Sequence, residues 1–62
     1  MSKLYAVDPK AVKPTIVTRY GDVVTTHTLR TKREADRLIL KLIKNGFTFC
    51  PQGADAILSE QA

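Results

Sequence analysis

Residues 31–47 read TKREADRLILKLIKNGF and predict one complete amphipathic helix with both ends marked. Thr31 and Glu34 have the spacing of a capping box, in which the Thr31 hydroxyl accepts from the Glu34 amide and the Glu34 carboxylate accepts from the Thr31 amide. Asn45-Gly46 ends the helix, because glycine readily takes the left-handed conformation that follows a helix C-terminus. Phe47 is then expected to fold back onto the last turn.

This helix has an apolar face and a cationic face. Apolar residues recur every three or four positions, which gathers them into a core-facing stripe made of Ala35, Leu38, Ile39, Leu42 and Ile43. At about 100° per residue, four cations cluster on the opposite side, and we call them the cationic ridge: Arg33, Arg37, Lys41 and Lys44. Like charges one turn apart destabilise a helix, so the ridge is either a plain solvated face or a surface for an anionic partner.

Leu40 lies beside the cationic ridge and off the core stripe. An apolar side chain among cations is a candidate contact anchor, although single exposed leucines are common on protein surfaces. We therefore take Leu40 and the ridge together as the first candidate binding surface.

Two β-branched runs before the helix predict a hairpin. Residues 15–20 and 23–29 flank Gly21-Asp22, a two-residue turn in which glycine supplies positive φ. Counting back from this turn pairs Tyr20 with Val23, Thr18 with Thr25 and Ile16 with His27, and one face should then meet the helix. The opposite face should be solvated or meet a partner, and it forms the second candidate surface, made of Val17, Arg19 and Val24.

The remaining segments complete an α+β fold with the order strand, strand, helix, strand. Residues 47–50 alternate as a strand that would place both phenylalanines in the core beside the hairpin, and Pro51 follows it. Residues 3–7 are an optional edge strand, and residues 54–59 are either a helical turn or a short strand. We expect one small domain over 1–62, with strand and linker at 1–14, the ββαβ core at 15–50, and a turn and tail at 51–62.

Length and composition limit the kinds of binding partner and the cellular compartment that we expect for this protein. A chain of 62 residues has room for one thin core. Its net charge of +4 favours nucleic acid, an acidic protein surface or anionic lipid over a basic partner. No apolar run approaches the roughly 20 residues of a membrane span, and residues 1–5 lack the apolar region of a secretory signal. We therefore expect a cytoplasmic protein.

The chain has few residues that could support catalysis or metal binding. It has one histidine, His27, and one cysteine, Cys50, which are too few for a structural zinc site or an internal disulfide. His27 in a threonine-rich strand is most simply a structural residue, and Cys50 a small strand residue before a proline. Glycine-rich phosphate loops are also missing from the sequence. We expect no catalytic residues, no metal and no cofactor.

Two binding functions remain. The first is a small regulator that modulates or inhibits a larger protein; the strand, strand, helix, strand order is similar, in topology and not in any motif, to small phage-encoded inhibitors of host RNA polymerase. The second is nucleic-acid binding by the cationic ridge, with weak sequence specificity because the helix has no asparagine or glutamine suited to adenine edges before Asn45, and no aromatic pair is expected on an outer face for base stacking. A short sheet also has open edges through which two copies of the chain can pair.

Overall fold

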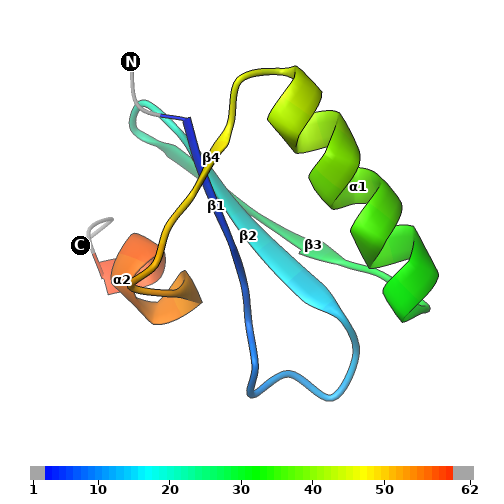
Figure 1. The fold of residues 1–62 in the computed structure, drawn as a ribbon. Coiled ribbons are helices and arrows are strands. Elements are labelled where there is room, and N and C mark those ends of the chain that lie inside the picture. The colour runs from blue at the N-terminus through cyan, green and yellow to red at the C-terminus, as the bar shows by residue number, and fades with distance from the viewer. Residues whose placement is uncertain (1–2, 60–62) are drawn as a thin grey trace.

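The computed structural model describes residues 3–59, which form a four-stranded mixed sheet with one helix on each face (Figure 1). The α+β fold and its ββαβ order are confirmed. The elements, in chain order, are β1 (Lys3–Val7), β2 (Thr15–Tyr20), β3 (Val23–Thr28), α1 (Lys32–Lys44), β4 (Thr48–Phe49) and α2 (Ala54–Ser59).

The hairpin forms in the register that the sequence predicts. β2 and β3 pair antiparallel with Tyr20 opposite Val23 and Ile16 opposite His27. Gly21 has a φ of 61°, and no residue other than glycine has positive φ in residues 3–59. Positive φ at the first central position alone is the pattern of a type II′ turn, whose twist matches that of the flanking strands.

The N-terminal strand is present, but its predicted position at the edge of the sheet is wrong. The strand order is β3-β2-β1-β4, so β1 is internal, antiparallel to β2 and parallel to β4. The physical reason is that β1 is apolar on both faces, with Tyr5 buried on one side and Ala6 fully buried on the other. β4 consequently pairs with β1 and not with the hairpin.

Helix α1 begins and ends where the sequence places its signals. The Glu34 amide donates to the Thr31 hydroxyl over 3.3 Å, but the Glu34 carboxylate accepts from the Arg30 amide over 3.2 Å, one residue earlier than predicted. At the other end Gly46 has a φ of 89°, and the Phe47 amide donates to the Leu42 carbonyl oxygen over 2.9 Å. This is the Schellman arrangement, which turns the chain from α1 into β4.

Helix α2 covers the sheet face that the sequence predicts to be open. Residues 54–59, for which the sequence allows a helical turn or a short strand, are helical, and Ala54 and Ile57, one turn apart, are both buried. They pack with Ala6, Val17 and Cys50 in one apolar cluster, and a second cluster lies under α1 around Tyr5, Ile16, Ala35 and Leu42. The thin sheet therefore has a small core on each side. The last residues of the predicted tail, 60–62, lie outside the described residues.

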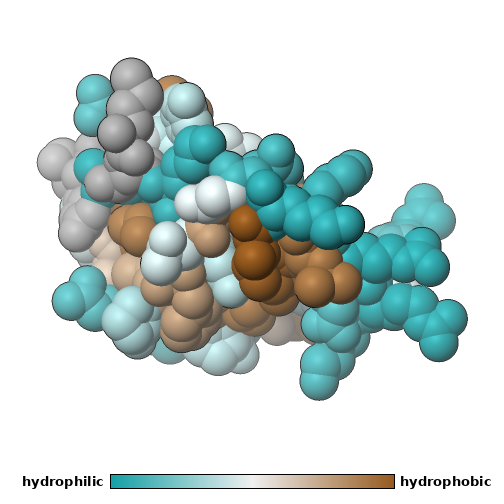
Figure 2. Space-filling model, turned by 45° about the horizontal axis from the view of Figure 1, so that its top comes forward, coloured by the Kyte–Doolittle hydropathy of each residue, from teal (hydrophilic) through white to brown (hydrophobic). Residues whose placement is uncertain are grey.

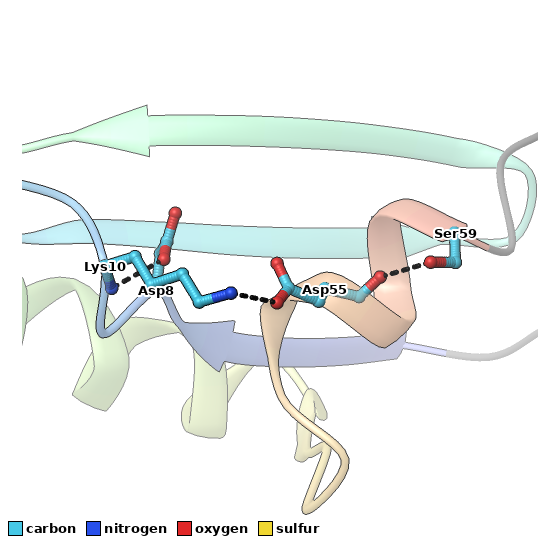
Figure 3. A network of polar contacts seen from close by, with 4 residues as sticks. All are labelled: Asp8, Lys10, Asp55 and Ser59. Atoms are coloured by element: carbon cyan, nitrogen blue, oxygen red, sulfur yellow. Dashed lines mark hydrogen bonds and ion pairs between the residues drawn. The ribbon is translucent and has the colours of Figure 1, made fainter.

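Polar contacts connect α2 to the loop between β1 and β2 (Figure 3). The Lys10 ammonium lies 3.5 Å from an Asp55 carboxylate oxygen, and the Lys10 amide donates to Asp8 over 3.0 Å. The Ser59 hydroxyl donates to the Asp55 carbonyl oxygen over 2.8 Å. Because Lys10 and Asp55 are both largely exposed, this ion pair orients the loop more than it stabilises the fold.

The packing of α2 predicts the effect of Ile57→Ala. Removing this side chain, which is 1% exposed, should lower the free energy of unfolding by about 2–5 kcal/mol, because it leaves a cavity between α2 and the sheet. Leu58→Ala is the matched control on the outer side of α2 and should cost less than about 1 kcal/mol. Urea denaturation of the two variants measures the difference; equal costs would mean that α2 does not pack as described.

Candidate functional site

The cationic ridge lies on the solvent side of α1. Arg33, Arg37, Lys41 and Lys44 are all exposed, and none of them forms an ion pair within residues 3–59. They lie on the side of the helix away from Ala35 and Leu42, the two α1 residues that are buried against the sheet. The ridge is thus a set of free positive charges on a rigid element.

Beside the ridge lies an apolar flank, whose residues on α1 are Leu40 and Ile43. Leu40 is 61% exposed, as predicted, but Ile43 is 51% exposed, although the sequence places it in the core stripe. Ile43 projects about 80° from Ala35 around the helix, at the outer margin of the stripe. Its burial therefore depends on how far the sheet extends beneath that margin, and the edge strand there, β4, has only two residues. Leu40 lies between Ile43 and the ridge on the same side of the helix.

This flank faces the β4 edge of the sheet. α1 runs antiparallel to β3 and β4 and connects them by a right-handed crossover (Figure 1). α1 is right-handed and runs in that direction. A side chain that is rotated about 90° past the core stripe, in the sense in which the helix winds, therefore points toward the second strand of the crossover, which is β4. Figure 2 shows hydrophobic side chains gathered in the middle of the view, with hydrophilic side chains along its upper and right borders.

Phe49 extends the apolar flank from the helix onto the sheet. The prediction that both phenylalanines lie in the core is wrong for Phe49, which is 53% exposed, whereas Phe47 is half-buried against the α1 cluster. Phe49 is exposed because β4 is the edge strand and has only two residues. Its ring packs edge-on against Tyr5, with centroids 5.7 Å apart, so it is held in place although it is exposed. We define the apolar flank as Leu40, Ile43 and Phe49.

Lys3 ties the C-terminal end of α1 to the sheet. Its ammonium donates to the Asn45 carbonyl oxygen over 2.9 Å, next to the negative end of the helix dipole. The same ammonium lies 5.4 Å from the Tyr20 ring centroid and 6.0 Å from that of Phe47. These contacts join β1, the hairpin and the turn after α1, so the apolar flank lies on a braced part of the fold.

The second candidate surface is largely closed. Val17 is 1% exposed beneath α2, so the expectation that this residue lies open to solvent is corrected, and Val24 packs at the margin of the same cluster. Arg19 is half-buried, and its Nε donates to the Gly21 carbonyl oxygen over 2.8 Å. The sequence does not predict this closure, because the short run at 54–59 is not long enough for its periodicity to identify a helix.

The structure brings no group of reactive side chains together in residues 3–59. The His27 Nε2 lies 3.3 Å from the Thr18 hydroxyl, and Cys50 is buried in the α2 cluster. No pocket and no group of three metal-ligating side chains occurs in this part of the chain. Neither of its helices is long and apolar enough to cross a membrane.

Comparison with known proteins does not assign a family. Neither the protein-family models, nor the curated proteins, nor the solved structures contain a match to this chain. The candidate site is therefore defined by its own geometry: the cationic ridge, the adjoining apolar flank, and the β4 edge of the sheet, where Phe49 packs against Tyr5.

The crowding of charge on the ridge predicts the effect of Arg37→Glu. This variant replaces repulsion by Arg33 and Lys41 with attraction at the same spacings, which outweighs the lost attraction to Glu34, so it should raise the free energy of unfolding by about 0.5–1 kcal/mol at low salt. Arg37→Gln removes only the repulsion and should give an intermediate increase. Urea denaturation at low and high salt measures both; salt should reduce the gain, and a gain that does not depend on salt would argue against charge repulsion.

Proposed function

We propose that this protein is a non-enzymatic regulator that binds an acidic surface of a larger protein and modulates or inhibits its action. The observation that carries the proposal is the position of the apolar flank directly beside the cationic ridge. The proposed place of this action is the cytoplasm, the compartment that the sequence predicts. A phage-type inhibitor of a host factor such as RNA polymerase is one form that it can take.

The apolar flank favours a protein partner. Small protein interfaces combine a central apolar or aromatic anchor with a polar rim, and the anchor supplies most of the affinity. Leu40 and Phe49 are exposed at 61% and 53%. The four cations of the ridge adjoin Leu40 around the helix. An acidic partner surface with an apolar centre matches this pattern in both hydrophobicity and charge.

Nucleic-acid binding would use the ridge but not the flank. Phosphate contacts need only positive charge and reach, which the four cations provide. Base stacking on single strands needs exposed aromatic platforms, but the most exposed candidate ring, Phe49, is already packed against Tyr5. Leu40 and Ile43 would have no role in such a complex. The apolar flank therefore favours protein over nucleic acid.

A capture experiment with Leu40→Ala tests the proposal. Tagged protein is incubated with lysate of the native host, in nuclease-treated and untreated halves, and a retained protein is then purified for affinity measurements. Leu40→Ala should weaken binding of that protein by about 1–3 kcal/mol, because it removes the apolar anchor. Val12→Ala is the matched control, since Val12 is fully exposed in the loop between β1 and β2 and lies outside the proposed interface.

The Arg37→Glu, Lys41→Glu double variant separates the two functions. For a protein interface, raising the salt concentration should act mainly on the association rate, and Leu40→Ala should cost more affinity than Val12→Ala. Capture that disappears with nuclease, falls steeply with salt, and is lost in the double variant but not in Leu40→Ala would make the ridge a nucleic-acid site. Binding that none of these substitutions changes would refute a role for this face.

A further inference from the structure

The outer edge of β3 is an unprotected pairing edge. β3 is the terminal strand of the sheet, and no other element of residues 3–59 pairs along its outer side. Its six residues include no acidic residue, lysine, arginine or proline, and charged residues and proline are features that usually blunt edge strands. α2 packs mainly over β1 and β2 and reaches β3 only at Val24. Four of the six β3 residues are exposed, so neither helix covers this edge: Val23, Thr25, Thr26 and Thr28. Figure 1 shows β3 on the far side of the sheet from β4.

The hydrogen-bonding groups of this edge can be assigned residue by residue. The Leu29 amide donates to the Pro14 carbonyl oxygen over 2.8 Å, so Leu29 directs its backbone groups toward the β2 side. The backbone N–H and C=O groups of successive residues in an antiparallel strand point alternately to its two sides. The backbone groups of Val23, Thr25 and His27 therefore also point toward β2. Val24, Thr26 and Thr28 therefore direct their N–H and C=O groups to the open edge.

We propose that two copies of this chain pair antiparallel through their β3 edges, around a two-fold axis at Thr26. In this register Thr26 lies opposite Thr26 of the second copy, and Val24 lies opposite Thr28 of the second copy. All three outward-facing residues of each copy then exchange both backbone hydrogen bonds, which joins the two sheets into one of eight strands. A shift of one strand by one residue relative to the other would place each of these residues opposite one whose backbone groups point toward β2.

Charge favours β3 as the surface for a second copy. Each chain carries a net charge of +4, so two copies that met through the cationic ridges would bring eight cations together. The β3 edge is the place where two copies can touch without such contacts, because the facing residues are threonine, valine and histidine. Cross-strand pairs of threonine and of β-branched residues are favourable in sheets. This pairing leaves the apolar flank free, so it is independent of the proposed function.

The position of Thr26 opposite its own symmetry mate provides the test. Thr26→Asp alone and Thr26→Lys alone should each convert a concentration-dependent dimer into a monomer, because each places two like charges in one cross-strand pair. An equimolar mixture of the two variants should restore the dimer, since the unlike charges then face each other. Sedimentation equilibrium over a range of concentrations measures all four samples, including the unchanged protein.

Control variants and amide exchange separate pairing at β3 from a general effect of added charge. Thr48→Asp and Thr48→Lys place the same charges on an exposed residue of the opposite edge strand β4, and they should leave the dimer intact.

Circular dichroism checks that each Thr26 variant is folded. If these variants unfold, hydrogen exchange of the unchanged protein tests the pairing instead. The amides of Val24, Thr26 and Thr28 should then gain protection with rising concentration. A monomer at all concentrations, a dimer that persists in both Thr26 variants, or a mixture that stays monomeric would overturn the proposal.

Discussion

The pairing of β1 between β2 and β4 is the constraint on which the rest of the structure depends. β1 is the first described element of the chain, yet it forms the centre of the sheet and contributes Tyr5 to one core cluster and Ala6 to the other. It also positions Lys3 against the end of α1, and Phe49 against Tyr5. Without β1, the hairpin and β4 would have no shared neighbour, and the α1 crossover would have no sheet to span.

A sheet only four strands wide cannot bury much on either side. With α1 on one face and α2 on the other, the chain makes two small cores in place of a single larger one, and both helices leave part of their apolar surface in solvent. Ile43 and Phe49 are exposed because α1 and the two-residue β4 meet at an edge where nothing further packs on them in residues 3–59. The same thinness that limits stability thus leaves an apolar surface available for contact.

Two surfaces of different character lie on opposite edges of this sheet. Near β4, the apolar flank and the cationic ridge suit a partner that is apolar at its centre and negatively charged around it. At β3, an uncharged strand with free backbone groups suits another β-strand, for which main-chain hydrogen bonds give the affinity. In the two proposals, one edge holds a second copy while the other remains free for a different partner.

The sequence by itself determined the local structure. The limits of α1, the Schellman turn at Gly46, the hairpin register and the exposure of Leu40 all follow from signals within a few residues, because caps, turns and helical periodicity act over one or two turns. Tertiary structure alone decided the place of β1 inside the sheet, the burial of Val17 under α2, and the exposure of Phe49 and Ile43. These depend on which distant segments pair and on which face a six-residue helix covers. A short apolar run is compatible with several such arrangements, and only their combined packing selects one.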